Sequence, residues 1–417
     1  MQCASILRTR VTAWRPGSLP KKPIKKETWM KIRSITSHQL RVPLGDKTFY
    51  SSQASFPERN SYLVCIETDT GLIGWGEGGQ YGPAEPVAAC VDAVLSRRLI
   101  GRDPTEPVRL WEELYAYSRD FGQRGTYIEA ISAIDIALWD IAAKAAGLPI
   151  WKMLGGRFRE KITAYATGCY YPKNFRDMPS VLLALEEEAA SHANSGFELL
   201  KVKIGLLPLQ QDIERLRVIR EAVGPSIGLL VDANHGYNAA TAVRMGRMME
   251  PLNVLFFEEP VPPEDRDGYR KVRAENPIPV AGGECDFTRY GFRDLIAGGC
   301  VDFVQPDLAV CGGFTAFTQI LAFANAYGVA TVPHVWGSGI AVAAALHAVA
   351  TIPPFPHTAN PTALLNEPVI EFDRKHNPLR DDLLQERFML NGGCLTIPDQ
   401  PGLGVAVRED ILAKYSN

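Results

Sequence analysis

The pattern of apolar and polar positions divides the chain into stretches of different character. Residues 30–158 begin with strand-like alternation, as in SYLVCIETDTGLIGWGEGG, where Asp69-Thr70-Gly71 predicts a hairpin turn. The segment 127–146, YIEAISAIDIALWDIAAKAA, places its isoleucines and a leucine on one helical face. Gly147 follows where a helix-ending glycine belongs. We therefore expect an N-terminal α+β capping domain over residues 30–158.

From residue 159 short apolar segments alternate with helical ones. The segments that read as buried strands are ITAYAT, ELLKVKI, IGLLVDA, VLFFEE, IPVAGGE, VDFVQPD, VATVPH and PVIEF. Their spacing of roughly 20 to 35 residues, with helical sequence between most of them, is typical of parallel β/α units. Eight units predict an α/β fold, a TIM-type (β/α) barrel over 159–372, with its active site at the carboxyl ends of the strands. Residues 373–417 have a mixed pattern, and we expect them to pack back on the cap.

The first 29 residues stand apart from the rest. They hold seven Lys and Arg but a single acidic residue, Glu27, and show no sustained periodicity. They lack the continuous apolar core and the cleavage site of a secretory signal. We expect a disordered tail, or a non-native extension with the native start at Met30; a targeting segment is the alternative.

Composition limits the classes of partner. The 417 residues are 46% hydrophobic and 22% charged, with a net charge of −3, as in an ordinary soluble protein. This balance argues against a nucleic-acid or anionic-membrane partner, and without a run of 18 apolar residues we expect no membrane span. The eight cysteines form no CxxC pair, which favours reduced thiols in a cytoplasmic protein.

Three acidic residues end segments that we expect to be buried strands. Asp232 ends IGLLVDA, Glu258 ends VLFFE and Glu284 ends IPVAGGE, and successive acids are 26 residues apart. A buried charge is costly unless a partner compensates it. One such acid could be a helix N-cap or a loop end. Three in register at one mouth of a barrel favour a Mg²⁺ site, because Mg²⁺ prefers oxygen ligands.

Two lysines lie two residues apart in ELLKVKIG. Lys201 and Lys203 point to the same side of a strand, so both face the barrel interior if either does. The interior of a barrel is usually apolar. Two adjacent cations near a metal lower each other's pKa, which would produce an amine able to act as a base. The alternative is that both lysines are structural counter-charges for the acids.

A second candidate base lies on the following strands. Asp307 follows VDFVQP, and His334 ends VATVPH 27 residues later. A carboxylate one unit upstream could orient the imidazole as a general acid or base, whereas a lone histidine is more often structural. On the last strand, Glu371 could hydrogen-bond an enolate oxygen opposite the metal. Either Glu371 or the nearby Glu367 could instead simply hold a loop.

Taken together, these motifs resemble one known family. KVKIG, VDANHGY, FFEEPV, AGGE, QPDL, CGG and PHVWG occur in this order, after the cap phrases GLIGWGE and AIDIALWDIAAKAAGLPIWKMLGG. The chain resembles the mandelate racemase subgroup of the enolase superfamily from about Met30 to its end. The phrases EFDRKHNPLR and TIPDQPGLG look most like the branch of acid-sugar dehydratases and galactarolactone cycloisomerases.

The resemblance implies a metal centre and its surroundings. Asp232, Glu258 and Glu284 would bind Mg²⁺. The loops around residues 44–58 and 79–86 would select the substrate. Other polar or aromatic residues at the strand ends would support the ligands or contact substrate: Asn234, His235, Glu259 and Trp336.

The resemblance also implies catalytic roles. Lys203 would be the base on one face of the substrate, with Lys201 lowering its pKa. His334, supported by Asp307, would act on the other face. The spacing of the last strand departs from that of mandelate racemase, which leaves the role of Glu371 open.

The expected function is that of a Mg²⁺-dependent carbon–oxygen lyase acting on a sugar acid or its lactone. Removal of the proton α to the carboxylate, followed by β-elimination, would make the protein a hydro-lyase or a lactone cycloisomerase. Reprotonation on the opposite face would instead make it a racemase or epimerase, and a barrel without catalysis would be an acid-sugar binding protein. We expect a small-molecule substrate and a homo-oligomer.

Overall fold

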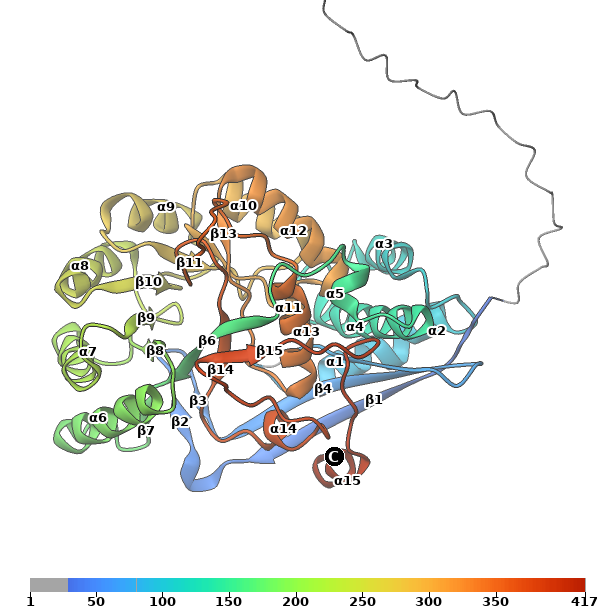
Figure 1. Cartoon of the computed structure of the whole chain (residues 1–417), viewed down its shortest axis with the longest axis horizontal. Coiled ribbons are helices and arrows are strands. Elements are labelled where there is room, and N and C mark those ends of the chain that lie inside the picture. The colour runs from blue at the N-terminus through green and yellow to red at the C-terminus, as the bar shows by residue number, and fades with distance from the viewer. Residues whose placement is uncertain (1–28, 80, 417) are drawn as a thin grey trace, which may run out of the picture.

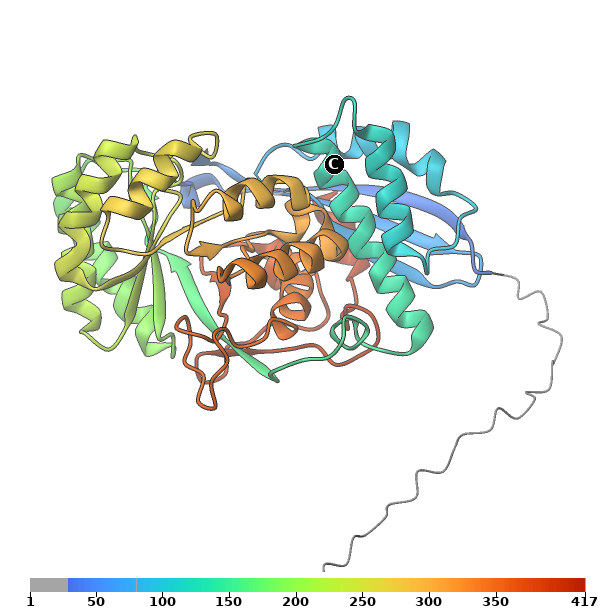
Figure 2. The same ribbon diagram turned by 90° about the horizontal axis from the view of Figure 1, so that it is seen from above.

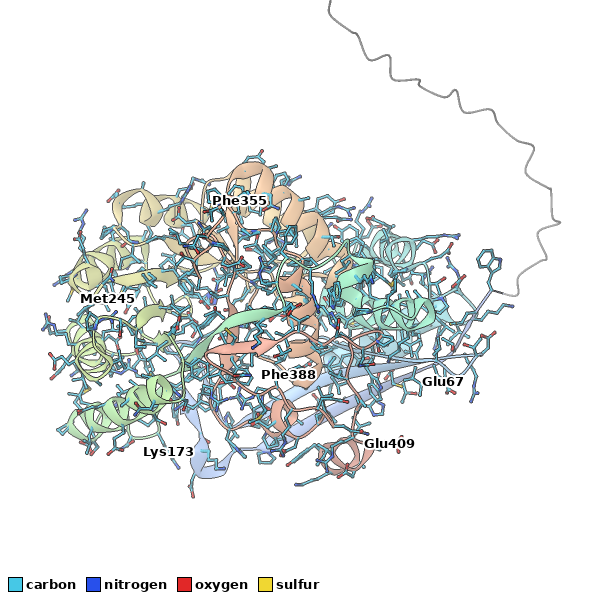
Figure 3. All side chains as sticks on the ribbon, viewed as in Figure 1. Glu67, Lys173, Met245, Phe355, Phe388 and Glu409 are labelled. Atoms are coloured by element: carbon cyan, nitrogen blue, oxygen red, sulfur yellow. The ribbon has the colours of Figure 1, made fainter. Side chains whose placement is uncertain are left out.

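A computed structural model describes residues 29–79 and 81–416. The expected N-terminal extension therefore lies outside the described residues, apart from Trp29. Figures 1 and 2 show a strand-and-helix array, residues 161–373, beside an N-terminal unit made of a small sheet and helices. Figure 3 shows side chains filling the space between these ribbons.

The N-terminal unit is built on an antiparallel sheet of order β1-β4-β5. Its strands are β1 (Ile32–Pro43), β4 (Glu58–Thr68) and β5 (Ile73–Glu77). The predicted turn at residues 69–71 joins β4 to β5, so the hairpin is confirmed. The helices of this unit are α1 (Glu85–Cys90), α2 (Ser96–Leu99), α3 (Pro107–Ser118), α4 (Thr126–Ala146) and α5 (Ile150–Met153).

Strand β5 lies directly on helix α4 because its glycines leave no side chain between them. A Cβ on Gly74, Gly76 or Gly78 would lie 2.2, 1.9 or 2.1 Å from a carbonyl oxygen of α4. Alternate strand residues share a face and meet successive helical turns, here at Ala137, Ala133 and Glu129. The glycines of GWGEGG thus serve backbone packing. The predicted helix is confirmed, and Gly147 ends it in the left-handed conformation, with φ 67°.

The second unit confirms the predicted eight parallel strands, which curl into a barrel-like sheet of order β13-β12-β11-β10-β9-β8-β6-β14. The strands are β6 (Lys161–Gly168), β8 (Leu199–Lys203), β9 (Gly228–Asp232), β10 (Val254–Glu258), β11 (Val280–Gly282), β12 (Phe303–Val304), β13 (Ala330–Thr331) and β14 (Ile370–Asp373). The residues pair in the order Lys203, Asp232, Glu258 across β8, β9 and β10. The chemistry-bearing residues therefore end neighbouring strands at one level.

Helices follow the barrel strands and cover the outside of the sheet (Figure 2). They are α6 (Met178–Asn194), α7 (Leu209–Val223), α8 (Ala239–Met249), α9 (Arg266–Glu275), α10 (Thr288–Ala297), α11 (Leu308–Cys311), α12 (Gly313–Tyr327) and α13 (Gly339–Ala350). Within the described residues, no helix is long and apolar enough to cross a membrane. The seven described cysteines are free thiols.

Two segments connect the N-terminal unit with the barrel. The loop after β1 forms β2 (Phe49–Tyr50) and β3 (Ser55–Phe56), which pair with each other, and β2 also pairs with β7 (Tyr171–Pro172) just beyond β6. This small sheet brings residues of the 44–58 loop to the carboxyl end of the barrel.

The C-terminal segment contacts both units. It holds α14 (Pro378–Asp381), β15 (Cys394–Thr396) and α15 (Glu409–Tyr415). Helix α15 lies against β1 of the cap, and Ser416 bridges to Leu40. Strand β15 pairs with β6, a barrel contact that the sequence pattern did not indicate.

Candidate active site

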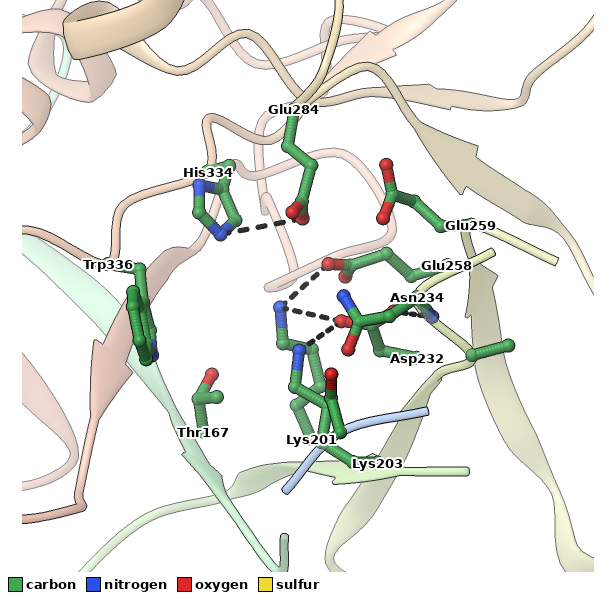
Figure 4. Close-up of polar contacts among 12 residues, drawn as sticks. Thr167, Lys201, Lys203, Asp232, Asn234, Glu258, Glu259, Glu284, His334 and Trp336 are labelled. Carbon is green, nitrogen blue, oxygen red and sulfur yellow. Dashed lines mark hydrogen bonds and ion pairs between the residues drawn. The ribbon is translucent and has the colours of Figure 1, made fainter. Parts of the chain in front are cut away.

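Three buried carboxylates meet at the carboxyl ends of β9, β10 and β11. Asp232, Glu258 and Glu284 each offer an oxygen within 4.8 Å of the others, and none is more than 3% exposed. Figure 4 shows them pointing into one space. No described residue donates a hydrogen bond to Oε2 of Glu284, although this oxygen is buried. A set of hard oxygen donors with an unpartnered buried oxygen fits Mg²⁺.

Both predicted lysines reach these carboxylates from β8 (Figure 4). Nζ of Lys201 lies 2.8 Å from Oε1 of Glu258, and Nζ of Lys203 contacts Oδ2 of Asp232. Lys201 is fully buried, also 3.0 Å from Glu371, whereas Lys203 borders a cavity. The two amines therefore occupy different positions relative to solvent and substrate.

The charges of the protein alone do not lower the pKa of these lysines. Burial lowers the pKa of Lys203, but Asp232, Tyr170 and Glu284 together more than compensate and hold it above the ordinary value. Glu258 and Glu371 do the same for Lys201. Lys201 does lower the pKa of Lys203, as the spacing predicts, but the neighbouring acidic groups outweigh this effect and the net shift is upward.

The predicted Asp–His pair is present beside the carboxylates. Nδ1 of His334 lies 2.6 Å from Oδ2 of Asp307, while Nε2 lies 3.5 Å from both Glu284 and Glu371. Asp307 also caps α11, since its other oxygen accepts the backbone N–H of Ala309 at 2.8 Å. Although burial opposes it, the charges of Glu284, Glu371 and Asp307 raise the pKa of His334 to about 10. The imidazole therefore holds a proton at neutral pH in this environment.

The two glutamates near the last strand have different surroundings. Glu371 is buried below the site, where Thr167 donates to it at 2.5 Å and Lys201 lies 3.0 Å away. Although burial opposes it, Lys201 and His334 lower the pKa of Glu371 to about 2. Glu367 instead forms a bidentate pair with Arg159, so it holds a loop away from the carboxylates.

A cavity of about 170 Å³ opens beside these groups. Lys203 and His334 both line it, together with Glu284 and Asn234. The rest of its wall comes from both cap loops and from aromatic residues near β6 and β13: Gln53, Ala54, Phe56, Tyr81, Tyr170 and Trp336. Residues of both loops that the resemblance singled out thus lie at the cavity.

The remaining predicted residues divide into two groups. Trp336 and Asn234 line the cavity, and within residues 29–79 and 81–416 the buried Oδ1 of Asn234 has no hydrogen-bond partner. His235 and Glu259 do not line it; Nε2 of His235 lies 2.9 Å from Oε2 of Glu259. Asn234 and His235 have φ of 39° and 64°, a left-handed backbone that sequence spacing does not reveal.

Two polar residues at the site were missed from the sequence. The hydroxyl of Tyr81 donates to Glu284 at 3.0 Å and lies 3.1 Å from the ring nitrogens of His334. Gln305 donates to Oε2 of Glu258 at 2.9 Å. Gln305 is a polar residue at the end of an apolar strand, as the three triad acids are. The same sequence pattern could therefore have identified it as a site residue. Tyr81 lies in a loop, where the sequence pattern does not predict which way a side chain points.

The cap also holds the segment that carries His334. Glu77, at the end of β5, is fully buried and accepts the backbone N–H of Ser338 at 2.9 Å and of Ala341 at 3.0 Å. A Cβ at Gly337 would lie 2.6 Å from this carboxylate. The start of α13 is therefore fixed by a side chain of the N-terminal unit.

Comparison with known proteins agrees with the geometry. Residues 43–155 match the mandelate racemase / muconate lactonizing enzyme N-terminal domain, and residues 184–411 match the enolase C-terminal domain-like family. The chain is 44% identical to a D-galactarolactone cycloisomerase of Agrobacterium fabrum, covering 93% of this chain and 99% of the relative. It is 37% identical to an arabinonate dehydratase of Saccharolobus solfataricus, covering 84% and 89%.

A solved structure has the same architecture. A racemase from Streptomyces coelicolor A3(2) with bound magnesium superimposes with a TM-score of 0.81 at 27% identity, covering 93% of this chain and all of that one. The chain therefore belongs to the mandelate racemase / muconate lactonizing enzyme family of the enolase superfamily, among its acid-sugar dehydratases and cycloisomerases.

Proposed function

We propose that the protein is a Mg²⁺-dependent lyase that removes the proton α to the carboxylate of a sugar acid or its lactone and then expels a β-oxygen. The observation that carries this proposal is the cavity, where an amine, an imidazole and a carboxylate of the triad face the same space: Lys203, His334 and Glu284. The names of the two relatives support a sugar acid or lactone as substrate.

The proposed base is Lys203. It alone of the two lysines borders the cavity, whereas Lys201 is enclosed by Glu258 and Glu371 and serves as their counter-charge. Asp232, Glu258 and Glu284 would hold Mg²⁺, which would supply positive charge to stabilise the negative charge that develops on the substrate carboxylate. Once the Lys203 ammonium has lost its own proton to solvent through the cavity, the neutral amine accepts the α-proton.

The proposed acid is His334. Its proton at neutral pH follows from the surrounding carboxylates, and Asp307 fixes the ring through Nδ1. Nε2 donates a proton to the departing β-oxygen as the carbon–oxygen bond breaks. If that oxygen is a hydroxyl, water leaves and a 2-keto-3-deoxy acid forms; if it is a lactone ring oxygen, the ring opens.

The proposal is tested by incubating the protein with Mg²⁺ and a panel of aldonates, aldarates and their lactones in D₂O. Keto-acid formation or lactone opening with deuterium uptake is the expected result. α-Epimerisation without a keto product would reject elimination and support a racemase. Binding without turnover of any panel member would support an acid-sugar binding protein.

Metal dependence is tested on the same panel. Glu258→Gln removes one ligand charge and should weaken Mg²⁺ binding and turnover together. Exhaustive chelation should abolish turnover, and Mg²⁺ should restore it. Full activity after chelation would remove the metal from the proposal. Action in the cytoplasm and as a homo-oligomer remain predictions.

A further inference from the structure

A second cluster of ligand-type side chains lies next to the carboxylate triad. Nε2 of His235, Oε2 of Glu259 and Sγ of Cys285 lie within 4.8 Å of one another. His235 follows β9 and Glu259 follows β10, while Cys285 comes directly after Glu284. One nitrogen, one oxygen and one sulfur donor therefore meet at three adjacent strand ends.

This cluster lies outside the cavity wall. Figure 4 shows Glu258 directed toward Lys201 and the neighbouring Glu259 directed elsewhere. Its three residues are absent from the cavity wall, and His235 and Cys285 are only partly buried. The partial exposure of His235 and Cys285 leaves the cluster accessible to solvent.

The buried oxygen of the cluster lacks a hydrogen-bond partner. Glu259 is 1% exposed, and no described residue donates a hydrogen bond to its Oε2. The nearest ring nitrogen, Nε2 of His235, lies 2.9 Å away but outside hydrogen-bonding geometry. An unpartnered buried carboxylate oxygen is costly, and a cation between the three donors would remove this cost.

The donor set selects the class of cation. Imidazole, carboxylate and thiolate together suit Zn²⁺ rather than Mg²⁺, which prefers oxygen alone. Two ligand atoms on a tetrahedral zinc ion lie roughly 3.3–3.6 Å apart. The observed separations, 3.8 Å from His235 to Cys285 and 2.9 Å from His235 to Glu259, lie on either side of this range.

We propose that His235, Glu259 and Cys285 form a binding site for Zn²⁺ that is distinct from the carboxylate triad. Binding transfers the thiol proton of Cys285 to solvent and leaves the fourth coordination position to water. Because each of the three lies within three residues of a triad acid, the zinc ion joins the strand ends that carry the triad.

The test uses Co²⁺ and Zn²⁺ in the presence of excess Mg²⁺. A bond between Co²⁺ and a thiolate gives a charge-transfer absorption in the near ultraviolet, which the all-oxygen triad cannot produce. We expect this band, and one Zn²⁺ per chain in equilibrium dialysis. Cys285→Ser should abolish the band and weaken Zn²⁺ binding at least about tenfold.

Two further variants test whether a lost absorption band could come from unfolding or from a thiol other than Cys285. Cys394→Ser, at another partly buried thiol in β15, should keep the band. His235→Gln should keep the thiol and weaken Zn²⁺ binding, with an unchanged circular dichroism spectrum. A band that survives in Cys285→Ser, zinc bound without a band, or no zinc bound at all would each overturn the proposal. None of these measurements needs a substrate, so their outcome is independent of whether the protein has the proposed lyase activity.

Discussion

The barrel mouth and the contact of α4 with α12 both bury carboxylates, but they treat them differently. At the contact, Asp135 of α4 accepts hydrogen bonds from the backbone N–H and the hydroxyl of Thr315, at 2.9 and 2.6 Å. At the mouth, oxygens of Glu284, Asn234 and Glu259 are buried without a hydrogen-bond partner among the described residues. In the first region, the chain itself supplies the hydrogen-bond donors that the buried carboxylate needs. In the second region, the described residues leave buried oxygens without a donor.

This difference separates stability from ligand binding. A buried acid whose oxygens are both bonded holds two elements together. Burial raises the pKa of Asp135 to about 7 despite these bonds, so even a satisfied site is costly to charge. A buried oxygen without a donor costs free energy in the absence of a ligand. Substitutions in the two regions should therefore affect different measurements.

The largest effect is expected at the mouth. His334→Asn should lower kcat/KM for the substrate found in the panel by about 10²–10⁴-fold, because it removes the proposed general acid. Some stability is also lost, because His334 carries a positive charge among buried carboxylates, so kcat/KM is compared per folded molecule. A loss of kcat/KM that is fully explained by a smaller folded fraction would contradict the distinction between ligand binding at the mouth and stability at the helix contact.

A smaller effect, on the pH dependence of stability, is expected for His347. This buried side chain has hydrogen-bond partners for both ring nitrogens. It donates to the carbonyl of Leu403 at 3.0 Å and accepts the N–H of Trp151 at 3.3 Å. Burial lowers its pKa to about 4, below the value of about 6.5 expected in the unfolded chain.

Its pH dependence follows from which state binds the proton. As pH falls from about 6.5 to 4, the unfolded chain binds a proton that the folded chain excludes, so stability is lost by about 3 kcal/mol. Denaturant unfolding of the wild type and of His347→Gln at pH 7 and pH 4 measures this loss. The variant should lose less on acidification; identical losses would contradict the assignment. Exposed His357→Gln is the control.

The α4–α12 contact should respond in stability alone. Asp135→Ala leaves the N–H and hydroxyl of Thr315 without their acceptor, at a cost of about 2 kcal/mol. Urea unfolding measures it. Turnover per folded molecule should stay at the wild-type level. A loss of turnover at full stability would show that the contact also controls the mouth.

The smallest effect is expected for Tyr81→Phe. The variant keeps the stacking on Trp336, whose ring lies 6.0 Å away at 13°, and loses only the hydroxyl contacts with Glu284 and His334. We expect about a tenfold loss in kcat/KM. A loss as large as that of His334→Asn would place Tyr81 among the catalytic residues.

The features that could be predicted from the sequence are those that depend on the spacing of residues along one strand or helix. All eight barrel strands follow from the spacing of apolar segments, and the positions of Asp232, Glu258 and Glu284 follow from charges that end such segments. The sign of the lysine pKa shift did not, because it depends on carboxylates contributed by other strands. Nor did the direction of His235, which depends on a left-handed backbone.

The buried Glu77 has a consequence for exchanging parts between relatives. It ties the last strand of the cap to the start of α13, four residues beyond His334. A barrel produced alone would lose the acceptor that aligns this turn, and a cap from another protein would restore it only with an acid at the same place. The two halves are therefore a matched pair, and chimaeras should be cut outside this junction.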